Sequence, residues 1–354
     1  MDHRWERLLH YAEEHYLDAL FLTDPEDVGY LTGFHGGCLL IIPGESPCLI
    51  ISDFERVDIE EVTGDCELVE VKPGTALEAV GGFLRGSSPD RLGYSTMLTH
   101  REFVELQSMV MQRGLCRQLV VMDRMDRWLR GVKDDRVLEQ ITQCCRIAES
   151  AFERVLQVAE PGLRELDLAA EIEWAMRKGG ASQYAFPTVV ASGPRSAGPH
   201  AMPTERRLQR GDLVVLDFGA RIGAGMSDLT RTLVIGEADG EQRQVYDGVF
   251  AAREAALNAI APGKIGAEIH SAAQRLLAAV GYSCYFAHGL GHSLGGGPDL
   301  VPDETEMLVP GNVVTVEPAV YIPGWGGVRL EDVVLVTHNG HRTLTRCSPR
   351  LIEI

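Results

Sequence analysis

The sequence predicts a mixed α/β (α+β) protein of two domains, over residues 1–125 and 126–354. Three observations support this prediction. The chain has 354 residues, which exceeds the length of one ordinary domain. In its first part, short apolar runs alternate with segments of helical periodicity. In its second part, one pattern of helix and strands occurs twice, about 100 residues apart.

Residues 1–125 have the pattern of an α/β domain. Apolar runs at residues 18–22, 38–42 and 48–52 have the length and composition of buried strands. Segments with helical periodicity lie between such runs. We therefore expect helices packed against a sheet, and we find no motif in this part that carries chemistry.

A long amphipathic helix is predicted over residues 134–159, where apolar residues recur at helical spacing. Pro161 and Gly162 follow it and favour a helix end there. The segment before the helix, residues 122–133, mixes charged residues around Trp128. We place the domain boundary in this segment, between residues 125 and 126.

The second domain contains an internal repeat. Residues 211–222 align without gaps with residues 311–322, and each copy is an apolar strand interrupted by one acidic residue. A Pro-Gly pair and a helical segment precede each copy, and a second acidic residue lies beside the apolar stretch that follows. Two such units would face each other with their acidic residues at the centre. These residues are Asp217 and Asp228 in the first copy and Glu317 and Glu331 in the second.

The four acidic residues predict a site for two divalent metal ions. An ionised carboxylate within an apolar strand is costly unless a cation or good hydrogen bonds compensate it. Arg231 and Arg329 are near in sequence, but two arginines do not easily neutralise four converging carboxylates. His288 and His292, in the glycine-rich sequence HGLGH, are candidates for a nitrogen ligand, and a structural role for either is the alternative. This mostly hard ligand set suits Mn²⁺, with Co²⁺ or Zn²⁺ feasible, and two such ions sharing a water generate hydroxide near neutral pH.

The charge of the chain excludes two classes of partner. The sequence has 33 Lys and Arg against 51 Asp and Glu, which gives a formal net charge of -18. Neither nucleic acid nor an anionic membrane is expected to bind, because an acidic surface gains nothing from counterion release. No apolar stretch approaches the roughly 18 residues of a membrane-spanning helix, and the N-terminal segment is amphipathic rather than a signal peptide. We therefore expect a cytoplasmic protein.

Five spaced motifs resemble those of the Xaa-Pro peptidases, a family related to methionine aminopeptidase and creatinase. They read DFG, SDLTRT, HGLGH, TVEP and RLED, and they lie at residues 217–219, 227–232, 288–292, 315–318 and 329–332. Residues 24–34 and 51–54 are similar to the creatinase-type N-terminal domain, so the resemblance covers nearly the whole chain. It implies a creatinase-like N-terminal α/β domain followed by a pseudo-twofold pita-bread metallopeptidase domain.

The resemblance also implies which residues hold the two divalent ions. Asp228 and Glu331 would bridge both ions, Asp217 would hold one, and His292 with Glu317 would hold the other. This set agrees with the argument from charge, which reached the same four carboxylates without reference to a family.

Further roles follow from the same resemblance. His200 corresponds to the family histidine that contacts the substrate and stabilises the developing charge, and Glu317 to a proton shuttle. His288 corresponds to a second histidine that lines the site, and Arg329 to an arginine that supports the metal-bound carboxylates. The implied activity is that of an Xaa-Pro aminopeptidase or dipeptidase, which cleaves before proline in a peptide substrate and works as a homodimer.

The sequence departs from the family on the substrate side. Seven positions after His292, where family members usually have a histidine, this chain has Asp299, and no histidine lies between His292 and Glu317. The loop in between is also shorter than usual. We expect this loss to reduce or alter activity. Two alternatives follow: a metal-binding pseudoenzyme that keeps the peptide cleft, or a hydrolase of a non-peptide amide related to the substrates of creatinase.

Overall fold

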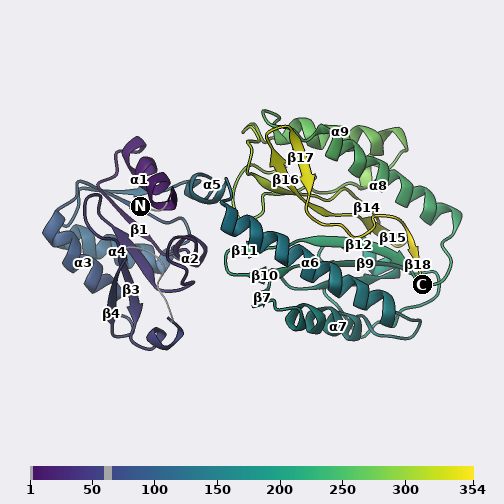
Figure 1. Ribbon diagram of the computed structural model, residues 1–354, viewed down its shortest axis with the longest axis horizontal. Helices are drawn as coiled ribbons and strands as arrows, with labels where there is room; N and C mark the ends of the chain where they lie inside the picture. Colours follow the sequence, from purple (N-terminus) through teal and green to yellow (C-terminus); the bar gives the residue numbers. More distant parts are fainter. Residues whose placement is uncertain (1–2, 60–65) are drawn as a thin grey trace. The chain divides into compact units, whose positions relative to one another are not determined.

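The computed structural model describes residues 3–59 and 66–354, and the chain divides into two compact units, Met1–Arg130 and Gly131–Ile354 (Figure 1). Both units combine helices with sheets, so the predicted mixed α/β fold is confirmed. Within these described ranges, no helix is long and apolar enough to cross a membrane.

A six-stranded mixed sheet forms the centre of the first unit, in the strand order β4-β3-β2-β1-β5-β6. The pairs β1–β2 and β2–β3 are antiparallel, and the remaining pairs are parallel. The three apolar runs predicted from the sequence form β1, β2 and β3. The strands are β1 (Ala19–Leu22), β2 (Cys38–Ile41), β3 (Cys48–Ser52), β4 (Glu67–Val71), β5 (Arg91–Tyr94) and β6 (Gln118–Val121).

Helices α3 and α4 pack on this sheet through their apolar faces. Val80 and Leu84 of α3 and Leu106 and Val110 of α4 join buried strand residues in one core. The burial of such a contiguous apolar face is the main force that holds helices on a sheet. The helical segments of this unit are α1 (His3–Glu14), α2 (Pro25–Thr32), η1 (Glu55–Asp58), α3 (Ala76–Ser87), α4 (His100–Arg113) and α5 (Met125–Arg130).

The long helix predicted in the second half of the chain is α6 (Asp135–Val158). Asp134 caps it, since its side chain accepts a hydrogen bond from the backbone nitrogen of Val137 at 2.9 Å. The other helical segments of this unit are α7 (Glu165–Lys178), η2 (Gly193–Ala197), α8 (Gly240–Ala259), α9 (Gly266–Ala279) and η3 (Ser283–Tyr285).

The strands of the second unit lie between two helix pairs, α6 with α7 and α8 with α9 (Figure 1). The sheets have the orders β18-β12-β9-β8, β13-β16-β17, β14-β15 and β11-β10-β7. The strands are β7 (Gln183–Tyr184), β8 (Val189–Ser192), β9 (Leu213–Phe218), β10 (Ala220–Ile222), β11 (Gly225–Met226), β12 (Leu229–Val234), β13 (Val313–Val316), β14 (Ala319–Ile322), β15 (Gly326–Arg329), β16 (Asp332–Thr337), β17 (Gly340–Thr343) and β18 (Ile352–Glu353).

The internal repeat of the sequence is also present in the backbone. The Gly162 nitrogen donates to the Leu208 carbonyl at 2.8 Å, and 101 and 100 residues later the Gly263 nitrogen donates to Leu308 at 2.8 Å. In each copy an antiparallel strand pair follows, β9 with β12 and β13 with β16. The predicted pseudo-twofold arrangement therefore brings two acidic strand pairs to the centre of the unit.

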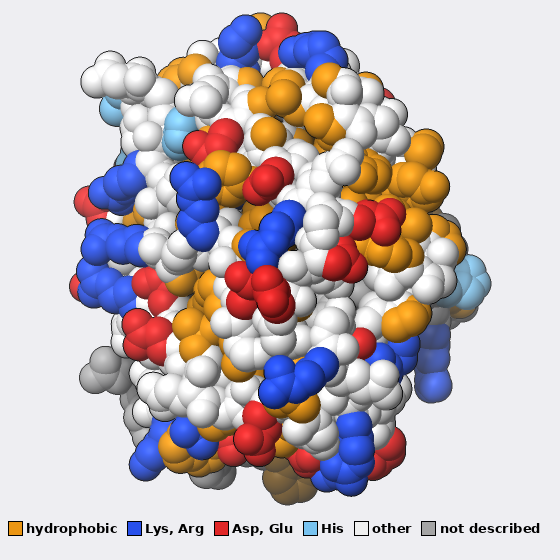
Figure 2. All heavy atoms as spheres, turned by 90° about the vertical axis from the view of Figure 1, so that its right-hand side faces the viewer, with side chains coloured by type: hydrophobic (Ala, Val, Ile, Leu, Met, Phe, Trp, Pro, Cys, Tyr) orange, Lys and Arg blue, Asp and Glu red, His pale blue; other side chains and the backbone are white. Residues whose placement is uncertain are grey.

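One face of the molecule shows how the charge is distributed. In Figure 2, acidic and basic side chains are interspersed on this face, and hydrophobic side chains gather toward one edge. Several basic side chains stand near one another at the opposite edge.

Candidate active site

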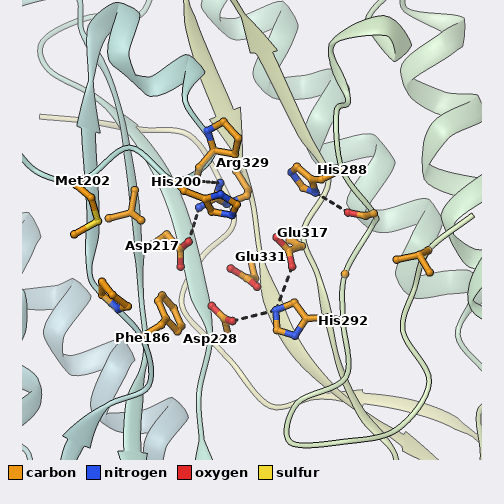
Figure 3. Close-up of a pocket in the computed structure, with 16 residues that line it drawn as sticks. Phe186, His200, Met202, Asp217, Asp228, His288, His292, Glu317, Arg329 and Glu331 are labelled. Atoms are coloured by element: carbon orange, nitrogen blue, oxygen red, sulfur yellow. Dashed lines mark hydrogen bonds and ion pairs between the residues drawn. The ribbon is translucent and has the colours of Figure 1, made fainter. Parts of the chain in front are cut away.

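All eight residues that the sequence predicts for the site line one pocket of about 660 Å³ in the second unit (Figure 3). The motifs that contain them are far apart in the chain, and the two copies of the repeat contribute from opposite sides. These eight residues are His200, Asp217, Asp228, His288, His292, Glu317, Arg329 and Glu331.

The strand pairs position the four carboxylates. Asp217 lies on β9 and pairs in register with Thr230 of β12, two residues after Asp228. Glu317 directly follows β13, and Glu331 directly precedes β16. Because alternate residues of a strand share a face, one acid per strand end projects into the pocket while apolar neighbours fill the cores. Glu331 is 1 % exposed, so water does little to screen its charge.

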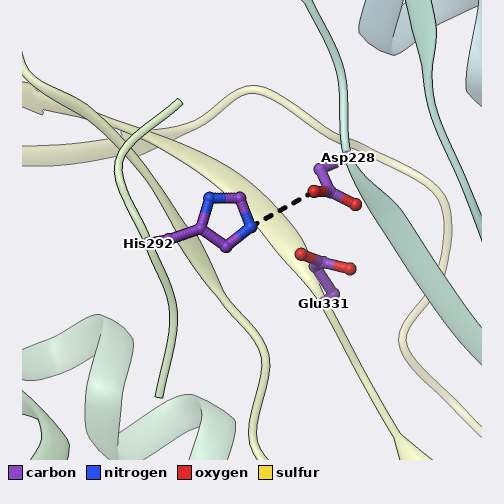
Figure 4. A group of neighbouring side chains, drawn as sticks. All are labelled: Asp228, His292 and Glu331. Carbon is purple, nitrogen blue, oxygen red and sulfur yellow. Dashed lines mark ion pairs between the residues drawn. The ribbon is translucent and has the colours of Figure 1, made fainter. Parts of the chain in front are cut away.

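Three of these side chains form a compact candidate metal centre (Figure 4). Among the described residues, Asp228, His292 and Glu331 each offer a ligand atom within 4.8 Å of the others. The His292 Nε2 atom lies 3.4 Å from Asp228 Oδ2 and 3.5 Å from Glu317 Oε1. Partial burial lowers the pKa of His292, but the two neighbouring carboxylates outweigh it and raise the pKa to about 9. The imidazole therefore faces a strongly negative pocket.

The carboxylates themselves require a positive partner. Burial raises the pKa of Asp217, Glu317 and Glu331 above the usual range, and the neighbouring carboxylates raise it further, although Arg329 acts in the opposite direction. Within residues 3–59 and 66–354, the buried Asp217 Oδ1 atom has no hydrogen-bond partner. An unpaired buried carboxylate oxygen is costly unless a cation binds it. The donor set therefore fits divalent metal ions.

Arg329 connects the carboxylates to the wall of the pocket. Its Nη2 donates to Asp217 Oδ2 at 2.5 Å, and its Nη1 donates to the Tyr321 hydroxyl at 2.6 Å and to the Pro199 carbonyl at 3.0 Å. The Thr230 hydroxyl accepts from Arg329 Nε at 3.0 Å and donates to Glu331 at 2.6 Å. Arg231, by contrast, pairs with Asp332 at 2.8 Å and does not reach the pocket wall.

His288 lines the pocket with both ring nitrogens engaged. Burial lowers its pKa to about 4, so the ring is neutral at physiological pH. Since Arg329 donates to the Tyr321 hydroxyl, that hydroxyl is free to donate to His288 Nε2 at 3.1 Å, and Nδ1 then donates to the Gly289 carbonyl at 2.6 Å. These two hydrogen bonds fix one tautomer of His288 and hold its ring in one orientation at the wall of the pocket.

The glycines of HGLGH allow the loop to lie directly on β13. A Cβ atom at Gly291 would stand 2.1 Å from the Thr315 carbonyl oxygen, which excludes any side chain there. The loop pairs with the strand through three hydrogen bonds: Thr315 N to His292 O at 2.8 Å, His292 N to Thr315 Oγ1 at 3.0 Å, and Glu317 N to Leu290 O at 2.8 Å. Close backbone contact thus sets His292 beside Glu317.

Asp299, at the position where the family resemblance predicts a histidine, does not line the pocket. Its Oδ1 accepts a hydrogen bond from the Ser293 backbone nitrogen at 2.7 Å, next to His292. Val301 is the residue of this segment that reaches the pocket wall. This segment therefore contributes the apolar side chain of Val301 to the pocket, and whether the absence of a histidine at 299 alters activity stays a prediction.

Sequence reasoning missed several residues of the site. Tyr321 and Thr230 support Arg329, and Phe186, Met202 and Val301 form apolar wall. Tyr321 lies four positions after Glu317 in the following strand, and Thr230 two positions after Asp228, so the alternation of the strands was a usable signal for both. The apolar wall residues come from loops that carry no periodic pattern.

Two duplicated strand pairs that bring carboxylates and an imidazole into one pocket define a metallohydrolase of the pita-bread type. The pattern of metallopeptidase family M24 matches residues 139–338, and that of the Creatinase/Prolidase N-terminal domain matches residues 4–132. The chain therefore belongs to metallopeptidase family M24, within the group of Xaa-Pro peptidases. This family uses divalent metal ions.

The chain is similar to named relatives over its full length. An Xaa-Pro dipeptidase of Pyrococcus furiosus is 32% identical over 366 residues, which cover 99% of this chain and 100% of the relative. The structure of an Xaa-Pro dipeptidase from Bacillus anthracis has a TM-score of 0.92 at 31% identity and covers 99% of both chains. An X-Pro aminopeptidase from Thermotoga maritima has a TM-score of 0.86 at 30% identity, with 98% of this chain and 100% of the other covered.

Proposed function

We propose that the chain is a dinuclear-metal hydrolase that cleaves the peptide bond between an N-terminal residue and proline. The observation that carries the proposal is the convergence of four carboxylates and the His292 imidazole on one pocket. The names of the relatives, Xaa-Pro dipeptidase and X-Pro aminopeptidase, support a peptide with proline as its second residue.

The proposed ligands of the two ions are Asp217, Asp228, His292, Glu317 and Glu331. The raised pKa values of the buried carboxylates and the unpartnered Asp217 Oδ1 atom support this set. Mn²⁺ is the first candidate because oxygen ligands outnumber nitrogen. When bound, two such ions would polarise the scissile carbonyl and lower the pKa of a shared water.

The remaining side chains orient the substrate and handle protons. His200 stands at the pocket wall, where an imidazole can donate a hydrogen bond to the carbonyl oxygen as negative charge develops. Glu317 accepts from the Thr315 hydroxyl at 3.0 Å, and its carboxylate can take a proton and deliver it to the leaving amine. Arg329 holds Asp217 and fixes the position of that carboxylate.

A panel of three peptides tests this function. Protein loaded with Mn²⁺ is incubated with Ala-Pro, Ala-Pro-Ala and Ala-Ala-Ala, bound metal is determined on the same sample, and Glu317→Ala serves as the inactive control. We expect cleavage before proline, lost in the control by at least about 10³-fold because a proposed ligand and proton carrier is removed. Cleavage of Ala-Pro alone identifies a dipeptidase, and cleavage of Ala-Pro-Ala identifies an aminopeptidase.

The same panel separates the alternatives. Full metal occupancy without cleavage of any peptide contradicts the proposal. That result would favour a hydrolase of non-peptide amides or a pseudoenzyme that keeps the peptide cleft. A homodimer, which the family resemblance implies, and a cytoplasmic location stay predictions from the sequence.

A further inference from the structure

The loop that carries His200 forms one wall of the pocket. We call residues 193–203 the His200 loop; it leaves β8 after Ser192 and ends at Thr204. Pro199, His200 and Met202 of this loop line the pocket (Figure 3). The His200 ring makes no hydrogen bond within the part of the chain that the structure describes. Its position is therefore set by the backbone of the loop.

A single buried carboxylate ties both ends of this loop. Glu165, the first residue of α7, is fully buried. Its Oε1 accepts from the backbone nitrogen and the hydroxyl of Ser192 at 2.8 and 2.7 Å. Its Oε2 accepts from the backbone nitrogen and the hydroxyl of Thr204 at 3.0 and 2.7 Å. Four hydrogen bonds from the two ends of the loop therefore meet on one side chain.

Arg195 extends this tie into the loop itself. Its Nη1 donates to Glu165 Oε2, and its Nη2 donates to the Met202 carbonyl at 2.8 Å. Burial raises the pKa of Glu165, but the hydrogen bonds from Ser192, Thr204 and Arg195 outweigh it and hold the pKa below its usual value. Glu165 is thus a stable anion whose charge is matched inside the fold.

The two copies of the repeat differ at the residue that begins the helix, and in the second copy a buried acid, Glu304, lies beside that position instead. One repeat later, 101 residues on, the position of Glu165 is occupied by Gly266. A Cβ atom there would stand 1.9 Å from the Asp299 carbonyl oxygen, so the second copy excludes a side chain at the start of its helix. The acid is present in the copy whose loop carries His200.

We propose that Glu165 is a positioning residue, which sets the place of His200 in the pocket by tying both ends of the His200 loop and Arg195 within it. The effect of these hydrogen bonds on catalysis rests on the proposed peptidase function. The hydrogen bonds between Glu165 and the loop do not depend on that function. Charge-assisted hydrogen bonds to a buried carboxylate are strong, so their loss should loosen the loop whose two ends they hold.

The test compares Glu165→Gln with Glu171→Gln. Glu171 lies on the same helix and pairs with Arg154 at 2.9 Å, and no hydrogen bond joins it to the His200 loop in the described residues, so it controls for the loss of one acid from α7. The amide side chain keeps the shape of Glu165 but offers its donors one acceptor oxygen fewer and no charge. The readouts are hydrogen exchange of residues 193–203, kcat and KM for the cleaved Xaa-Pro peptide, and bound metal.

We expect Glu165→Gln to speed amide exchange in the His200 loop at least about tenfold. It should lower kcat about 10- to 100-fold, because a loosened His200 loses part of the roughly 10²- to 10³-fold that one oriented hydrogen-bond donor contributes in the transition state. KM should change less than kcat, and metal content should equal that of the wild type. Glu171→Gln should match the wild type in every readout. Unchanged exchange and kcat in Glu165→Gln overturn the proposal, as does an equal effect of the control.

A second variant covers the case in which Glu165→Gln does not fold. Arg195 is 32 % exposed, so Arg195→Met is expected to fold. This substitution removes only the hydrogen bonds of Arg195 to Glu165 and to the Met202 carbonyl. It should accelerate exchange around Met202 and lower kcat by a smaller factor than Glu165→Gln; wild-type exchange and kcat would overturn the proposal. If the wild type cleaves no peptide, the proposed function fails, and hydrogen exchange alone still decides whether Glu165 holds the loop.

Discussion

Asp228 is one of the two buried carboxylates of the candidate metal centre. It directly precedes β12. Its carboxylate lies close to the side chains of His292 and Glu331 (Figure 4). It is 7 % exposed, so solvent cannot replace a cation as its partner. This residue therefore provides a sharp test of whether the two ions share a carboxylate.

We predict that Asp228→Asn lowers metal content and activity together. The amide keeps the shape but loses the charge and one strong ligand oxygen, so bound metal should fall below two ions per chain and the rate should fall by at least about 10³-fold. Metal analysis and peptide cleavage on the same sample measure both. Unchanged metal content would show that Asp228 does not bridge the ions.

We also predict that a histidine at position 299 does not raise activity. Asp299 faces the Ser293 backbone nitrogen rather than the pocket, so Asp299→His removes that acceptor and should lower the free energy of unfolding by about 1–3 kcal/mol. Peptide cleavage and denaturant unfolding of the variant check both parts. A large gain in rate would mean that the side chain at 299 can reach the substrate after all.

At the scale of the element, the contact between HGLGH and β13 decides where the imidazole stands. Gly291 touches the Thr315 carbonyl, and the hydrogen bonds of His292 and Glu317 depend on that closeness. The sequence predicted the participating strand and the glycine-rich loop, because alternation and glycine content are local signals. The pairing of loop and strand was not predicted, because it depends on a contact between segments more than 20 residues apart.

We predict that Gly291→Ala impairs metal binding. A methyl group 2.1 Å from the Thr315 oxygen forces the loop away and moves His292, so affinity for the metal should fall at least about tenfold. Gly240→Ala is the control, because a Cβ atom there meets no atom within 4 Å at the start of α8. Titration with Mn²⁺ measures the affinity of both variants. Equal affinities would show that the loop can adjust without moving its ligand.

At the scale of the whole molecule, the sequence predicted the fold class, the long helix α6 and the duplicated strands, because their patterns are periodic or repeated. It also predicted, through charge and resemblance, eight of the residues that line the pocket. It did not predict that Glu165 anchors the His200 loop, or that Tyr321 engages His288. These contacts join separate elements through hydrogen bonds, and a hydrogen bond of this kind has no signature in local sequence.

The assembled acidic pocket makes metal binding part of the stability of the second unit. Four carboxylates held close together repel one another, so ions that bind the folded chain alone should stabilise it, by about 2.7 kcal/mol at a free concentration 100 times the dissociation constant. Removal of the metal with a chelator should therefore lower both the melting temperature and the activity.

The most direct measurement is a titration of Mn²⁺ into chelator-treated protein, with bound metal, melting temperature and Ala-Pro or Ala-Pro-Ala cleavage followed together. We predict that two ions bind per chain, that the melting temperature rises with them, and that cleavage before proline appears as the sites fill. Cleavage at full rate in the metal-free protein, or two bound ions with no cleavage of either peptide, would contradict the account.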